Sequence, residues 1–291
     1  MRITETRMLQ MMSGRTMDTQ SSIAKAGSQV STGIAVNQPS DDPVRWAEGM
    51  RTKLSMDRRD MHESTVERAR DNLNRTDAAL GEVFDRLSDV RQLAMLGGNE
   101  SYSTAGRTTA ALEVNQLLDS MIAAANAQSA SGEFLLAGSN SSVQPFDAAG
   151  NYQGNGVIRG IEAGDDVSKR ANVPGSVLTA AGGTDVFSLV VQVRDALAAD
   201  DPTAVRGFME QLNGALEQVA YARSEAGVAS SSLEQSVDTL SDLEVNLANS
   251  LEKSVGADPI EAATWLASLG NQLEASRIVS ERIVSMMSLQ G

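Results

Sequence analysis

Few side chains in this sequence could perform catalysis or hold a metal ion. The chain of 291 residues contains one histidine, His62, and no cysteine. Thiol catalysis, disulfides and cysteine metal sites are therefore excluded, and no second histidine or clustered carboxylate stands out at a metal-ligand spacing from His62. We interpret His62 as a surface residue and predict that the chain is not an enzyme, with no catalytic residue, no cofactor and no metal ion.

Two glycine-rich stretches could be mistaken for phosphate-binding loops. They are Gly154-Asn155-Gly156 and Gly182-Gly183. Neither follows a buried strand, and neither carries the lysine that a Walker loop requires. Their composition favours hairpin turns instead.

The charge and apolar content exclude further classes. A formal net charge of -14 disfavours nucleic acid and anionic membrane surfaces as partners, because both require an excess of Lys and Arg. The N-terminus shows no Sec-type signal peptide, and the longest apolar run, near residues 186–193, is shorter than the ~20 residues that span a bilayer. We therefore expect a soluble protein.

The strongest structural pattern is a heptad register that runs from residue 205 to residue 254. Its seam, read at alternating steps of three and four, is apolar except at serines. A helix of that length would be roughly 75 Å long, so the sequence predicts an elongated helical rod. Aromatic residues make up only 3% of the chain, which fits a thin helical bundle better than a thick core.

Two other helices have seams with matching steps and are the predicted partners within the chain. The first is expected at residues 43–96 and the second at residues 106–131. The charged first half of the 43–96 helix is interpreted as a solvated, ion-paired face; its residues are Arg51, Lys53, Asp57, Arg58, Arg59, Asp60 and Glu63. The predicted rod core consists of Val66, Leu73, Leu80, Val83, Leu87, Val114, Leu118, Met121, Phe208, Leu212, Val219, Leu233, Leu240, Leu243 and Leu247.

An Asp-Pro pair recurs before three of the predicted helices. The pairs are Asp42-Pro43, Asp201-Pro202 and Asp258-Pro259. Aspartate is a favourable N-cap, and proline is tolerated at the first helical position because its missing N–H would be unpaired there. Glu261 completes a predicted capping box with Asp258.

Both ends of the chain carry weaker heptad seams, at residues 9–33 and 262–287. Polar positions such as Thr16, Thr19, Ser276 and Ser280 interrupt them. Helices with so little apolar surface are marginal in water, so we expect the ends to be ordered only when partners cover them. We predict that the two seams pair antiparallel and that copies of the chain meet there, through Leu9, Met12, Ile23, Ala26, Val30, Ala262, Leu266, Leu269, Leu273, Ile283 and Met287.

Between residues 132 and 184 the chain becomes rich in Gly, Asn, Ser and Asp. Short β-type runs at residues 134–136 and 157–158 lie between turn signals, which predicts a small β-rich module inserted between helices. The predicted organisation is an N-terminal assembly helix and linker (1–42), the first part of a helical rod (43–131), the inserted β-rich module (132–184), the second part of the rod (185–256) and a C-terminal assembly helix (257–291).

Several stretches resemble the flagellin superfamily. They are Met1-Arg2-Ile3-Thr4, Gln29-Val30-Ser31-Thr32-Gly33 and Ala222-Arg223-Ser224-Glu225-Ala226-Gly227. Within it, the chain is similar to the flagellar hook-associated protein 3 family, the FlgL type. That similarity rests on Ser40-Asp41-Asp42-Pro43, Gly132-Glu133-Phe134-Leu135-Leu136-Ala137-Gly138-Ser139, Pro145-Phe146-Asp147, Tyr152-Gln153-Gly154-Asn155 and the ending from Asp258.

This resemblance implies a flagellin-like, mainly α fold and a structural role at the hook-filament junction of the bacterial flagellum. Family members form a ring that contacts hook-associated protein 1 on one side and the first flagellins on the other. They are extracellular after export by the flagellar type III apparatus, and a cytoplasmic export chaperone is an expected partner.

The alternative is a minor or short flagellin that forms filament itself. Trp46 and Glu48 stand where flagellins usually have small residues, which favours the junction adaptor.

Overall fold

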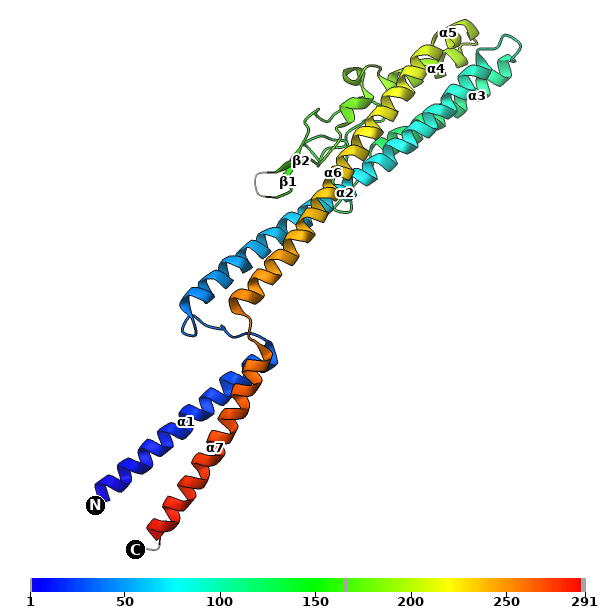
Figure 1. The fold of residues 1–291 in the computed structure, drawn as a ribbon. Helices are drawn as coiled ribbons and strands as arrows, with labels where there is room; N and C mark the ends of the chain where they lie inside the picture. Colours follow the sequence, from blue (N-terminus) through cyan, green and yellow to red (C-terminus); the bar gives the residue numbers. More distant parts are fainter. Residues whose placement is uncertain (1, 165–166, 289–291) are drawn as a thin grey trace. The chain divides into compact units, whose positions relative to one another are not determined.

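The structure, a computed structural model, describes residues 2–164 and 167–288; the side chains of residues 2–6, 8, 9, 284 and 286–288 lie outside the described part. The described chain is mainly α-helical with one small antiparallel sheet (Figure 1). The predicted fold class, mainly α with a small inserted β-rich module, is confirmed. Its elements are α1 (Arg2–Thr32), α2 (Pro43–Gly97), α3 (Thr104–Ala125), β1 (Gly160–Glu162), β2 (Ser168–Arg170), η1 (Gly175–Leu178), η2 (Ala180–Gly182), α4 (Val186–Ala198), α5 (Pro202–Gly207), α6 (Met209–Val255) and α7 (Pro259–Ser288).

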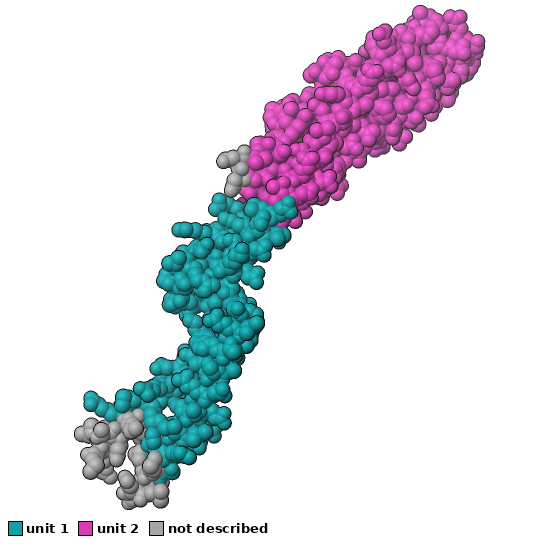
Figure 2. Space-filling view, in the orientation of Figure 1, with its two compact units in different colours: residues 1–58, 242–291 teal, residues 59–241 magenta. Residues whose placement is uncertain are grey.

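The chain divides into two compact units, which Figure 2 shows in different colours. One contains residues 59–241, and the other contains residues 1–58 together with residues 242–291. The long helices α2 and α6 each contribute to both units.

In the unit of residues 59–241, α2, α3, α4 and α6 share one apolar core. Buried side chains of α2 at residues 80–94 pack with those of α3 at 110–125, α4 at 186–197 and α6 at 212–222. A second cluster joins Val66, Ala69 and Leu73 of α2 to α6 residues of the same heptad register. The prediction that the α6 seam finds its partners in α2 and α3 is therefore confirmed, while the contribution of α4 was not predicted.

The inserted module packs on this core through an aromatic cluster. The ring of Phe146 lies 5.1 Å from that of Tyr152 and 4.8 Å from that of Phe187 in α4, between ring centroids. The Tyr152 hydroxyl lies 2.9 Å from the carbonyl oxygen of Leu136, and burial raises the pKa of Tyr152. Asn126, just after α3, exchanges two hydrogen bonds with the backbone of Phe146. These contacts hold the loops of the module against α4 and the end of α3.

The strands of the module are not where the sequence predicted them. β1 and β2 pair antiparallel, with Ile161 opposite Lys169. The expected runs at 134–136 and 157–158 form no strand among the described residues; Phe134 makes only an isolated bridge to Gln128. Leu135 and Leu136 are buried, and Leu136 packs in the core cluster of the helices, so their apolar character reflects burial and not strand pairing.

Three helix details differ from the sequence prediction. α3 ends at Ala125, not near residue 131, because the Asn126 side chain turns to the Phe146 backbone. The long seam is interrupted at Phe208, which separates α5 from α6. Leu243 is 43% exposed, so its assignment to the rod core was wrong; residues 241–246 are all exposed. The other predicted core residues are buried, except that Phe208 and Leu247 are half-buried.

The three predicted aspartate caps are confirmed. Asp42 accepts hydrogen bonds from the amides of Val44 and Arg45, and Asp201 caps α5 in the same way. Asp258 accepts from the amides of Ile260 and Glu261 at 2.8 and 3.2 Å. The predicted capping box is only half formed, because within the described residues the Glu261 carboxylate makes no hydrogen bond back to Asp258.

Candidate assembly site

In the unit of residues 1–58 and 242–291, α1 and α7 lie side by side and run in opposite directions, as predicted (Figure 1). Among the predicted assembly residues, Ala26, Ala262 and Leu269 are buried. Met12, Ile23, Leu266, Leu273 and Ile283 are half-buried, and Val30 is exposed. The side chains of Leu9 and Met287 lie outside the described residues. Most of these seam residues thus have reduced exposure within one chain, and their role between copies remains a prediction.

Other apolar side chains of the same helices are more exposed. They are Met11 and Met17 in α1 and Ile260, Trp265, Ile278 and Val279 in α7, with exposed fractions between 38% for Trp265 and 77% for Ile260. The heptad analysis missed them because it selected the residues that face the partner helix. The available signal was the presence of large apolar side chains outside the heptad seam.

Two linkers cross at the end of this helix pair. Residues 33–36, after α1, pair with residues 255–257, between α6 and α7, around an antiparallel bridge from Ile34 to Gly256. The amide of Ala35 donates to the Val255 carbonyl at 2.8 Å, and the amide of Ala257 donates to the Gly33 carbonyl at 2.9 Å. Backbone pairing therefore fixes the entry to α7 against the exit from α1.

Arg45, in the first turn of α2, donates hydrogen bonds to backbone carbonyls at this crossing. Its Nε donates to the Ser254 carbonyl at 2.8 Å, and its Nη2 donates to the Gly256 carbonyl at 3.1 Å. These carbonyls lie at the end of α6, where helical partners run out. Nearby, Gly49 is buried so close to Val255 that an added Cβ would collide with the valine side chain.

Lys25 of α1 is joined to the linker by an ion pair. Its Nζ lies 2.6 Å from Oδ1 of Asp41, while Oδ2 of Asp41 accepts from the amides of Asn37 and Gln38. The hydrogen bond from Lys25 is the main reason that the pKa of Asp41 is lowered from its ordinary value. The linker conformation is thus coupled to the charge of one carboxylate.

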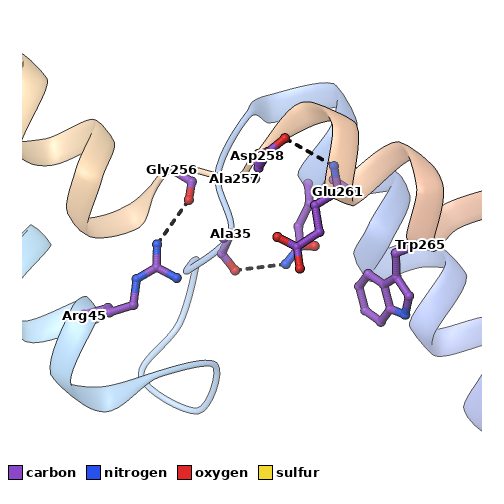
Figure 3. A pocket seen from close by; sticks show the side chains of 9 residues that line it. Ala35, Arg45, Gly256, Ala257, Asp258, Glu261 and Trp265 are labelled. Atoms are coloured by element: carbon purple, nitrogen blue, oxygen red, sulfur yellow. Dashed lines mark hydrogen bonds between the residues drawn. The ribbon is translucent and has the colours of Figure 1, made fainter.

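A cavity of about 440 Å³ opens beside the crossing (Figure 3). Arg45 lines one side, and Glu261 and Trp265 of α7 line another. The Gln29 amide at its wall donates to the Ala35 carbonyl. Within the described residues, the Glu261 carboxylate makes no ion pair and the Trp265 indole N–H has no hydrogen-bond acceptor.

The charged half of α2 is only partly ion-paired. Arg59 is buried; it donates to the Leu240 carbonyl and pairs with Asp60 and Glu63. In contrast, the exposed Arg51, Lys53 and Arg58 make no ion pair with any described residue. The interpretation of a solvated, ion-paired face is therefore met only in part: these three residues are exposed but not ion-paired, and Arg59 is ion-paired but buried.

Neither metal binding nor membrane crossing finds support in the described residues. They contain no cluster of three or more metal-ligating side chains. None of their helices combines the length and apolar character needed to cross a bilayer. His62 is half-buried, with Nδ1 3.3 Å from the Glu162 carbonyl oxygen, so its ring contacts the inserted module. In the unit that contains α1 and α7, the features considered for function are helix faces and the polar cavity beside the crossing.

Comparison with known proteins identifies the relatives of this arrangement. The family described as the bacterial flagellin N-terminal helical region matches residues 4–141. Flagellar hook-associated protein 3 of Salmonella typhimurium is 27% identical over 146 residues, which are 50% of this chain and 46% of that protein. The resemblance to flagellar hook-associated protein 3 is confirmed.

Two further comparisons agree with it. Flagellar hook-associated protein 3 of Escherichia coli is 23% identical over 183 residues, or 62% of this chain and 54% of that protein. The matched stretches thus cover about half the length of these two relatives. FlgL of Xanthomonas campestris has the same fold, with a TM-score of 0.61 at 19% identity, over 70% of this chain and 99% of that one.

Proposed function

We propose that this protein is a structural subunit of the bacterial flagellum, an adaptor at the hook-filament junction. The observation that carries the proposal is its similarity to flagellar hook-associated protein 3 of Salmonella typhimurium. In this role copies of the chain form a ring that joins hook-associated protein 1 to the first flagellins. A structural role is also consistent with a site made of helix faces and not of reactive side chains.

The paired ends of the chain supply the contacts that such a ring needs. α1 and α7 expose large apolar side chains, among them Met11, Met17 and Ile278, which a neighbouring subunit would cover. Repeated head-to-tail contacts of this kind close into rings or continue into open tubes. The adaptor would reach the extracellular flagellum through the flagellar type III apparatus, accompanied in the cytoplasm by an export chaperone.

Gene deletion tests the adaptor. In the deletion strain we expect cells without filaments and flagellin monomers shed into the medium, and restoration of filaments by the intact gene. Filaments that persist in the deletion strain would refute the adaptor role.

A minor flagellin is the second candidate, because the matching family covers the flagellin N-terminal helical region. This alternative predicts that the purified chain polymerises into long filaments without other flagellar proteins. Electron microscopy of concentrated protein distinguishes the two, since an adaptor would form at most short rings or remain monomeric.

A further inference from the structure

The cavity beside the linker crossing presents two groups suited to a cation. The Glu261 carboxylate and the Trp265 ring both line it (Figure 3), and within the described residues neither the carboxylate nor the indole N–H has a hydrogen-bond or ion-pair partner. A carboxylate next to an indole face favours a guanidinium, which pairs with the first and stacks on the second. Arg45 cannot take this place, because its Nε and Nη2 already donate to backbone carbonyls.

The same chain carries guanidinium groups without partners. Arg51 and Arg58 of α2 are exposed and unpaired within the described residues. They are seven residues apart, so they lie on one face two turns from each other. In a chain of net charge -14, two unpaired arginines on one face form a local basic surface whose natural complement is acidic.

We propose that Glu261 and Trp265 of one copy receive Arg51 of a second copy, with Arg58 continuing the same contact. This inference rests on the proposed function, because it names residues through which adaptor subunits would meet. The charge complementarity lies within one sequence, so identical copies satisfy it without any other partner.

The cavity with Glu261 and the surface with Arg51 are positioned so that each copy could contact a further copy in the same way. Arg45 faces the cavity, and Arg51 follows it by six residues, which turns its side chain about 120° away around the helix. The acidic cavity and the basic surface therefore occupy different faces of the chain. A contact between two different faces is heterologous, the type that generates rings and tubes.

Cross-linking between single-cysteine variants tests the contact directly. The natural chain has no cysteine, so every disulfide that this chain forms would involve an introduced residue. Glu261→Cys and Arg51→Cys, carrying tags of different size, are coexpressed in the deletion strain, and isolated flagella are oxidised with copper phenanthroline. We expect a dimer that contains both tags. The matched control replaces Arg51→Cys by Arg75→Cys, an exposed arginine of the same helix in the other unit, and should give no such dimer.

Two results would overturn the proposal. One is assembled flagella in which the mixed dimer is absent, or no more abundant than with Arg75→Cys. The other is a cross-link from Glu261→Cys to a different protein in place of the second copy. Either result leaves the adaptor role intact as long as filaments depend on the gene, whereas filaments that grow without the gene refute the adaptor role itself.

Charge exchange provides a second, independent measurement. Glu261→Arg should reduce the number of filaments at least 5-fold, and adding Arg51→Glu with Arg58→Glu should restore most of it. Glu274→Arg, an exposed glutamate further along α7, is the control and should have little effect. An unchanged filament number in Glu261→Arg would contradict the proposal. So would a triple variant that has the helix content of the natural chain but does not restore the filament number.

Discussion

Arg45 and Ser254, 209 positions apart in the sequence, are joined by a 2.8 Å hydrogen bond from the guanidinium Nε to the backbone carbonyl. Together with the bond to Gly256, it ties the first turn of α2 to the end of α6. Gly256 is itself bridged to Ile34, so the same guanidinium also contacts the paired linkers. Backbone pairing and one arginine side chain therefore act together at the crossing.

Replacing Arg45 should loosen the crossing locally. Arg45→Ala removes two hydrogen bonds with a charged donor, and because Arg45 is only half-buried we expect a loss of about 1–2 kcal/mol. The amides of Ala35, Val36 and Ala257, which donate across the crossing, should then exchange roughly 5 to 30 times faster. Arg51→Ala, which removes an exposed and unpaired arginine, should leave these rates unchanged.

Asp41 should make the linker conformation sensitive to acid. Its pKa is lowered in the folded chain, so this contribution to stability is fully present above the ordinary value of about 3.9 and is lost as pH falls through the lower folded value. The amide shift of Gln38, which donates to Asp41, reports the titration by NMR. We expect a midpoint below about 3.9, and Lys25→Gln should raise it. A midpoint that Lys25→Gln leaves in place would contradict the role of the ion pair.

The inserted module should depend on Phe146 more than on its strands. Phe146 is fully buried between Tyr152 and Phe187, and truncation of such a ring costs about 3–5 kcal/mol. We expect Phe146→Ala to speed amide exchange throughout residues 132–184 while α6 remains protected. Tyr221→Ala removes an aromatic ring that is 69% exposed and should change neither region. If Phe146→Ala speeds exchange only in β1 and β2 and leaves the rest of residues 132–184 protected, the aromatic cluster is not what holds the module.

Residues with a local physical signal were predictable from the sequence, and residues fixed by distant contacts were not. The caps at Asp42 and Asp258 and the buried seam around Leu80 and Leu233 follow from spacing alone. The contact between Arg45 and the Ser254 carbonyl could not be predicted, because the two residues are 209 positions apart and no local pattern indicates which carbonyls an arginine will bind.

The candidate site shows the same division. The antiparallel pairing of α1 and α7 follows from the heptad steps. The cavity does not, because it exists only where the two linkers cross and where Glu261 turns away from the cap that its spacing predicted.

The two ends of the isolated chain should exchange faster than its centre. α1 and α7 bury few large side chains, while α6 between residues 212 and 240 is packed against two clusters. We expect fast amide exchange before Asp42 and after Asp258 in the monomer, slow exchange across residues 205–240, and protection of both ends after assembly. Strong protection of both ends in a verified monomer would refute ordering by assembly.

Two leucine substitutions separate folding from assembly. Leu240 of α6 is 4% exposed, and Leu240→Asp should lower the free energy of unfolding by at least about 2–5 kcal/mol, since removal of a buried leucine side chain alone costs that much. Leu273 of α7 is half-buried in the unit that contains α1, so Leu273→Asp should leave the monomer folded and reduce filament number. Urea unfolding followed by circular dichroism, with filament counts on complemented cells, measures both effects. An equal loss of monomer stability in the two variants would mean that α7 belongs to the folding core of the monomer. The terminal helices would then be stably folded before assembly, and the proposal that assembly orders them would be refuted.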